Sequence, residues 1–229
     1  MAKKVFIGVG HGGTDSGAVA NGFKEKDLNL SIALACKAEL ERHGVSVRMS
    51  RTKDENDPVS QEINECNSFS PDLAVDIHNN AGGGDGAEVF HSVLCGTSLT
   101  LAANIISEIK KAGQNSRGIK TKRNSNGADY YGFIRETKAP AVIVECAFVD
   151  NRTDMQIVDT AAEREAMGAA IAKGILKTLG VAYKAGTGEV GQSIPGRLYR
   201  VQVGAYAVRS NAEAMAKKLK AAGFDATIV

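Results

Sequence analysis

Two histidines and one glutamate occupy positions from which they could hold a metal ion. His11 lies in a glycine-rich loop after a short apolar run, Glu25 stands at the start of a helical pattern, and His78 ends another apolar run. Two imidazoles and one carboxylate form the open three-ligand set of a catalytic zinc ion, which leaves a position for water. Simpler interpretations also exist, because a glutamate at a helix start favours the helix dipole and a histidine at a strand end is often only hydrogen-bonded.

A second carboxylate, Glu145, lies inside the β-branched run Val142–Val149. A carboxylate on such a strand is costly unless it is paired or used in chemistry. It could be a solvated strand end, or it could be a general base beside a metal-bound water. In the second case apolar surroundings would raise its pKa, or the cation would hold it low.

Cys146 suggests a different chemistry, that of a Cys-dependent amidase acting with His78 and resisting chelators. Neighbouring residues on a strand point to opposite faces, so Glu145 could not serve Cys146 as a base. The cysteines lie far apart without a CxxC pair, which argues against a disulfide framework or a Cys-based zinc finger. They are Cys36, Cys66, Cys95 and Cys146, and we expect Cys36 and Cys146 to be buried and reduced.

The segment 8–13 reads G-x-G-x-x-G directly after a strand pattern, as in dinucleotide-binding sites. Such a site needs a helix that begins within the motif and presents its N–H groups to a pyrophosphate. Here turn-forming residues continue to Gly22, and the second strand ends in Ser50-Arg51 without an acid for a ribose. We therefore set the nucleotide interpretation aside.

Alternating strands and helices must position these side chains. Strand patterns cover residues 5–9, 45–49, 73–77, 87–91 and 141–148, and helical patterns cover 28–40, 98–112 and 160–179. This rhythm predicts an α/β fold with a mostly parallel twisted sheet and helices on both faces. Ligands in such sheets bind beyond the carboxyl ends of the strands, which is where His11, His78 and Glu145 are expected.

The 229-residue chain is long enough for one domain and a small appendage. We expect a catalytic domain at 1–182, a flexible glycine-rich linker at 183–197 and a small β-α-β unit at 198–229. From residue 183 onward the chain carries seven basic residues and three acidic ones.

Composition excludes several function classes. A net charge of +2 and an aromatic content of 5% argue against a dedicated nucleic-acid binder. No apolar run approaches the ~18–20 residues of a membrane span. The apolar run at 5–9 is too short for a signal-peptide core, so we expect synthesis in the cytoplasm.

Six short motifs occur together and in order, and they carry a family resemblance. They are Gly10-His11-Gly12-Gly13, Asp15-x-Gly17-Ala18, Gly22-x-x-Glu25-Lys-x-Leu28, Ser50-Arg51-Thr52, Ile77-His78-x-Asn80 and Val144-Glu145-x-x-Phe148. Across roughly residues 3–180 the chain resembles the zinc-dependent N-acetylmuramoyl-L-alanine amidases of the amidase 3 type. These enzymes hydrolyse the amide that joins the lactyl group of N-acetylmuramic acid to L-Ala in peptidoglycan.

The resemblance implies a role for each candidate residue. His11, Glu25 and His78 would ligate one Zn²⁺ ion, and Glu145 would be the catalytic acid/base. Glu145 would take a proton from the attacking water and return it to the leaving nitrogen. We expect Asn80 to make a polar substrate contact near the site.

Three features depart from the family pattern. Gly8-Val9 replaces the usual Asp-Pro, an Arg that is common in the family falls near Glu62, and Ala147 stands where the family has Gly. None of these changes removes a ligand, although they could alter the fit of the substrate. A non-catalytic peptidoglycan-binding protein is the remaining alternative, and the intact ligand set argues against it.

The tail resembles one half of a SPOR domain, a β-α-β-β-α-β sandwich that binds glycan strands stripped of stem peptides. Because one half cannot cover both faces of a sheet, we expect two chains to form a homodimer through residues 198–229. The absence of a leader, combined with a wall substrate, suggests action on the cell wall after mother-cell lysis or as a phage endolysin.

Overall fold

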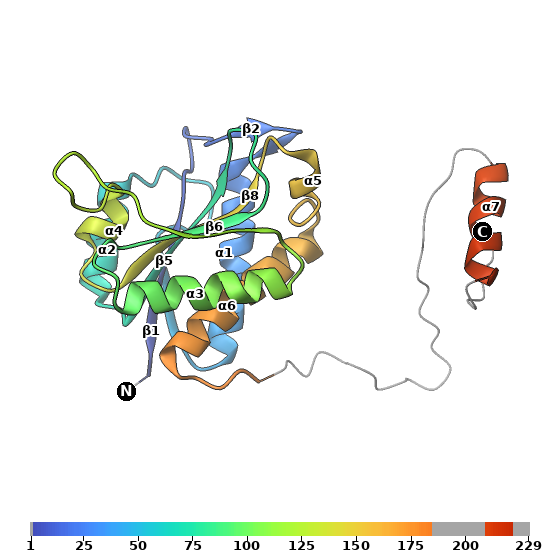
Figure 1. Ribbon diagram of the computed structural model, residues 1–229. Coiled ribbons are helices and arrows are strands. Elements are labelled where there is room, and N and C mark those ends of the chain that lie inside the picture. The colour runs from blue at the N-terminus through green and yellow to red at the C-terminus, as the bar shows by residue number, and fades with distance from the viewer. Residues whose placement is uncertain (1, 185–208, 222–229) are drawn as a thin grey trace. The chain divides into compact units, whose positions relative to one another are not determined.

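The computed structural model describes residues 2–184 and 209–221 of a chain that divides into two units, Met1–Lys184 and Ala185–Val229 (Figure 1). The strands of the first unit are β1 (Lys4–Val9), β2 (Val19–Ala20), β3 (Phe23–Lys24), β4 (Ser46–Met49), β5 (Leu73–Asn80), β6 (Ala87–His91), β7 (Ser116–Lys120) and β8 (Ala141–Phe148). Its helices are α1 (Glu25–Arg42), α2 (Val59–Phe69), α3 (Thr97–Lys111), α4 (Gly132–Glu136), α5 (Arg152–Met155) and α6 (Ala161–Leu179).

Six strands form one sheet in the order β4-β1-β5-β8-β6-β7. The first four are mutually parallel, as the sequence predicts. β6 runs antiparallel to β8, and β7 runs parallel to β6. The sheet is therefore mixed, and the start of β6 lies at the same edge as the carboxyl ends of β1, β5 and β8.

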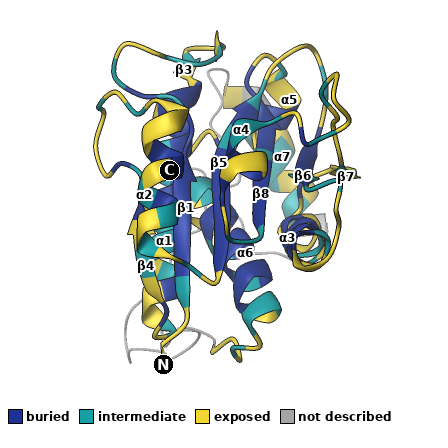
Figure 2. Cartoon of the chain, turned by 90° about the vertical axis from the view of Figure 1, so that its left-hand side faces the viewer, coloured by how far each residue is buried: buried dark blue, intermediate teal, exposed yellow. Residues whose placement is uncertain are grey.

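Alternation of side chains along the strands builds two apolar layers. On β1, Val5 and Ile7 face the layer that contains α1, α3 and α6, whereas Phe6 faces the layer that contains α2 and α4. Figure 2 shows the central strands buried between these layers. The expected α/β fold with helices on both faces is confirmed. On β8, Glu145 shares the α2/α4 face with Ile143, because the two are separated by one residue.

Helix α1 brings its first residue to the metal centre. Leu28, Ile32, Cys36 and Leu40 recur at four-residue spacing, and all are buried against the sheet. The preceding residue Lys24 is extended and closes the small β2–β3 hairpin, so the helix can begin only at Glu25. Burial of the apolar stripe thereby fixes where Glu25 lies relative to the strand ends.

The second unit is described only at α7 (Arg209–Ala221). Half-buried residues at helical spacing line one side of this helix, and they are Ala212, Met215, Ala216 and Leu219. The predicted linker, apart from its first two residues, and both predicted strands of the tail lie outside the described residues. Among the described residues, none of the helices combines the length and apolar character that crossing a bilayer requires.

Candidate metal centre

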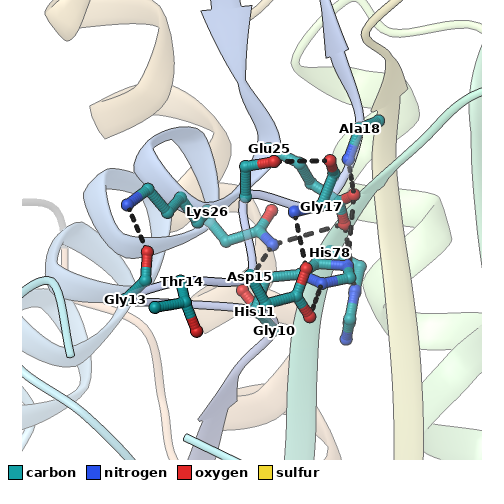
Figure 3. A network of polar contacts seen from close by, with 12 residues as sticks. Gly10, His11, Gly13, Thr14, Asp15, Gly17, Ala18, Glu25, Lys26 and His78 are labelled. Carbon is teal, nitrogen blue, oxygen red and sulfur yellow. Dashed lines mark hydrogen bonds and ion pairs between the residues drawn. The ribbon is translucent and has the colours of Figure 1, made fainter. Parts of the chain in front are cut away.

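Three predicted ligands meet at the carboxyl edge of the sheet. Ligand atoms of His11, Glu25 and His78 all lie within 4.8 Å of one another (Figure 3). Nε2 of His11 is 3.2 Å from Oε2 of Glu25, and Nδ1 of His78 is 3.0 Å from Oε1. The two imidazoles stand edge to face with their centroids 5.2 Å apart. This arrangement can hold one metal ion between two nitrogens and one carboxylate.

Strand pairing explains why residues far apart in the sequence converge. Val9 is paired with Ile77, so the loop after β1 begins beside His78. His11 adopts a φ of 63°, a conformation that is uncommon outside glycine and is often found at functional sites. The loop continues through turns until α1 begins at Glu25, so no helix starts within the G-x-G-x-x-G segment, as expected from the sequence.

Glu25 is the buried charge of the centre, with 5% of its surface exposed. Its Oε2 accepts the Ala18 N–H at 3.0 Å, and its Oε1 accepts the Asn79 N–H at 3.2 Å. Burial alone would raise the pKa of this carboxyl, but the hydrogen bonds from His11 and His78 outweigh it and hold the pKa far below its ordinary value. Glu25 is therefore an anion that is ready to bind a cation.

Each imidazole has an outer carboxylate on its second nitrogen. Nδ1 of His11 is 2.8 Å from Oδ2 of Asp15, and Nε2 of His78 is 3.1 Å from Oδ2 of Asp76. A proton on those nitrogens leaves the other nitrogen of each ring free to bind a metal, as in carboxylate–histidine–zinc groups. The residues present thus fit a zinc ion in both donor type and outer support.

The pKa values of both imidazoles are raised above the ordinary value by the carboxylates around them. At His11 the main cause is the hydrogen bond with Glu25. At His78 burial alone would lower the pKa, but the carboxylate of Asp76 outweighs burial and raises it. Metal binding requires neutral imidazoles, so it would release protons from this centre.

Two of the departures from the family pattern lie against each other. A Cβ atom on Gly8 would come 1.9 Å from Oε1 of Glu62 and 2.7 Å from Oδ1 of Asp76. The Glu62 side chain therefore occupies the space that a side chain at position 8 would need. Burial, reinforced by Asp76, raises the pKa of the Glu62 carboxyl well above its ordinary value. Asp76 is the carboxylate that contacts His78 directly, with 3.1 Å between Oδ2 and Nε2.

Glu145 lies beside the three ligands, in register with His78 on the neighbouring strand. It is half-buried, and its Oε2 has no hydrogen-bond partner among the described residues. Burial raises its pKa to about 7. This carboxyl can therefore give or take a proton near neutral pH, although the catalytic role of Glu145 stays a prediction.

The other candidates have different surroundings. Cys146 points into the core on the opposite face from Glu145, and burial raises the pKa of its thiol well above the ordinary value. The structure thus gives no support to a Cys-dependent mechanism. Cys36 is buried as expected. Asn80 directs its amide towards Glu88, with 3.4 Å between Nδ2 and Oε1, and its substrate contact stays a prediction.

The sequence did not indicate the residues that hold the three ligands in place. Asp15, Asp76 and Asn79 were absent from the candidate residues, as was Asn29, which donates to the Gly10 carbonyl at 2.9 Å. Asp76 could have been found, since it precedes His78 by two residues on one strand and so shares its face. Asn29 could not, because its contacts depend on the packing of α1 against the ends of β1 and β5.

Gly10→Ala tests how the loop and His78 fit together. A Cβ at this position would come 2.1 to 2.5 Å from Cε1, Nε2 and Nδ1 of the His78 ring. We expect the ring to be displaced and zinc affinity to fall about 10–100-fold, the range for losing outer-shell support. Isothermal titration calorimetry with Zn²⁺ measures the change. Gly22→Ala is the control, since its Cβ meets open space and it adds only backbone strain. Unchanged affinity in Gly10→Ala would contradict the geometry.

Comparisons with known proteins agree with this geometry. The model of the N-acetylmuramoyl-L-alanine amidase family Amidase_3 matches residues 5–177, and the SPOR domain model matches residues 195–229. N-acetylmuramoyl-L-alanine amidase CwlM of Bacillus licheniformis is 35% identical over 99% of this chain and 84% of its own length. The sporulation-specific amidase of Bacillus subtilis is 33% identical over the same shares.

A solved structure supports the same assignment for the first unit. Cwp6 from Clostridium difficile superposes with a TM-score of 0.76 at 38% identity, over 78% of this chain and 30% of that chain. The family model spans the loop after β1, the start of α1 and the ends of β5 and β8, which carry the candidate residues. The chain therefore belongs to the zinc-dependent N-acetylmuramoyl-L-alanine amidases of the Amidase_3 family and carries a C-terminal SPOR domain match.

Proposed function

We propose that His11, Glu25 and His78 hold one zinc ion and that Glu145 is the catalytic acid/base of this peptidoglycan amidase. The observation that supports this proposal is the convergence of the three ligand atoms within 4.8 Å of one another. The carboxyl of Glu145 lies beside them, in register with His78. The bond cleaved is the amide between the lactyl group of N-acetylmuramic acid and L-Ala, as the family implies.

The zinc ion and Glu145 have different roles in the proposed hydrolysis. A zinc ion at this centre would polarise the lactyl carbonyl and lower the pKa of a water molecule. Glu145 takes the proton from the attacking water as the carbon–oxygen bond forms. It then returns that proton to the L-Ala nitrogen as the carbon–nitrogen bond breaks. Burial raises the pKa of Glu145, and a zinc ion beside it would lower that pKa and favour the carboxylate that takes the first proton.

The outer residues keep the centre in one geometry during these steps. Asp15 and Asp76 fix the ring orientations of His11 and His78, and Asn79 fixes one oxygen of Glu25. These contacts come from the loop after β1 and from β5, which are braced by the central sheet. Asp76 and Asn79 are buried, whereas the Asp15 side chain is 68% exposed, so Glu25 and His78 have the more rigid support.

Removing the metal and removing the base are expected to have different effects. A chelator should abolish peptidoglycan hydrolysis and added zinc should restore it.

Glu145→Gln should retain zinc but lose turnover by about 10²–10⁴-fold, whereas His78→Ala should lose zinc. Elemental analysis and release of peptides with a new N-terminal Ala measure both effects. Near wild-type turnover by Glu145→Gln would refute its role, and new reducing sugar ends would indicate a glycosidase instead.

For the tail we propose that two chains each supply one half of a wall-binding SPOR module, giving a homodimer through residues 198–229. The support is the SPOR match, which covers 195–229, together with the half-buried stripe of α7 that includes Met215 and Leu219. The many basic residues of the tail would be doubled on one module, which raises attraction for an anionic wall.

Light scattering tests the shared module. We expect a dimer for the full chain at micromolar concentration and a monomer for a chain that ends at Leu179. A monomeric full chain would refute the dimer while leaving the amidase assignment intact.

We further propose that the enzyme acts on the wall when a mother cell lyses or when a phage lysin is released. The support is the sporulation-specific relative that aligns with 99% of this chain. Detection of the protein in the medium of intact growing cells would contradict this route.

A further inference from the structure

A cationic pair lies on the edge strand β7, which β6 separates from Glu145 on β8. Arg117 and Lys120 both form ion pairs with Glu88 on β6, with 2.8 Å between Nε of Arg117 and Oε1 of Glu88. Glu88 is buried, whereas the side chains of Arg117 and Lys120 are 41% and 34% exposed. Two cations therefore share one buried anion, and one positive charge remains at the surface.

Strand pairing places Glu88, the anion that the two cations share, beside Glu145. β6 runs antiparallel to β8, and Glu88 is the register partner of Glu145. Opposed residues on antiparallel strands have Cα atoms about 4.5–5.5 Å apart, so Glu88 lies one strand away from Glu145, and Arg117 and Lys120 lie on the next strand. Asn80 approaches the same carboxylate, with its Nδ2 at 3.4 Å from Oε1 of Glu88.

A bulge directs Arg117 towards this position. Ala87 pairs with Ser116 and Glu88 with Gly118, so Arg117 is the extra residue of β7. Gly118 has a φ of +84°, which accommodates the bend. Bulges at sheet edges often re-aim a side chain beside an active site.

The guanidinium of Arg117 retains donors that could bind a ligand. Its Nε is engaged by Glu88, and its carbon Cζ lies 5.2 Å from the ring centroid of Phe148. Within the described part of the chain its two terminal nitrogens make no hydrogen bond. A planar guanidinium fixed at Nε presents these nitrogens as a fork, which matches the geometry of a carboxylate.

From these observations we propose that Arg117, assisted by Lys120, binds a carboxylate of the stem peptide. The inference rests on the proposed function. In uncleaved peptidoglycan the lactyl carboxyl is part of the scissile amide, so the carboxylates of the substrate belong to the peptide. A carboxylate subsite beside Glu145 therefore places the stem peptide over β6 and β7 and the glycan strand on the other side of the centre.

A pair of substrates that differ in one group tests the subsite. Both are muropeptides with the same glycan, and the second stem residue carries either a free α-carboxylate or the corresponding primary amide. We expect the wild type to prefer the acid by about tenfold in kcat/KM, mainly through KM, because a charge-assisted contact is lost with the amide. Arg117→Gln should abolish this preference. Lys111→Gln is the control for loss of one positive charge, since it lies on α3, on the opposite face of the sheet.

Two further variants keep the test decisive. If Arg117→Gln unfolds because Glu88 loses a partner, Arg117→Lys keeps the charge without the fork, and Arg117→Gln/Glu88→Gln removes both charges together. Loss of the acid preference in a folded variant supports the subsite. An equal fall for both substrates, or a preserved acid preference, overturns it. Failure of the wild type to cleave either substrate overturns the proposed function instead.

Discussion

The buried carboxylate of Glu25 is the constraint on which the rest of the centre depends. An anion with 5% exposure must be compensated, and here two imidazoles and two backbone N–H groups do so. Those partners come from the loop after β1 and from β5, and Glu25 itself begins α1. A change in any of these elements would leave the charge uncompensated, so the fold and the metal centre stabilise each other. A bound cation would satisfy the same requirement more fully.

Two glycines near this carboxylate leave the space that neighbouring side chains occupy. Gly10 lets the backbone of the loop pass directly against the His78 ring, and Gly8 leaves room for Glu62 over Asp76. The departure at position 8 thus accompanies the departure at position 62. Of these two carboxyls, Asp76 contacts the His78 ring, and Glu62 fills the space beside Asp76 that a side chain at position 8 would need.

The sequence predicted the parallel core well because its strands are continuous apolar runs. The end of β1 and the middle of β8 were placed correctly, whereas β5 continues past its predicted end at Ile77 to Asn80, so His78 lies within the strand. His11, His78 and Glu145 still meet at one edge, as expected. The reversed direction of β6 was not predicted, since an apolar run carries no information about the direction of its pairing. The opposition of Glu88 and Glu145 depends on that direction and was therefore missed.

Polar elements were also missed. The periodicity gave no strand at β7, where Ile119 is the only large apolar residue, and the bulge at Arg117 has no sequence pattern of its own. Helix α2 buries only Glu62, Ile63 and Cys66, so its apolar spacing is too sparse to predict it. Helix α2 packs on the face of the sheet that Glu145 shares, whereas β7 is the edge strand beside β6.

The central claim is that two imidazoles and one carboxylate of this chain bind zinc. Zinc K-edge X-ray absorption spectroscopy on the protein loaded with one equivalent of Zn²⁺ tests it directly. The account predicts a first shell of nitrogen and oxygen at about 2.0–2.2 Å, with the multiple-scattering pattern of two imidazoles. A sulfur scatterer at about 2.3 Å, or a shell without an imidazole pair, would contradict it.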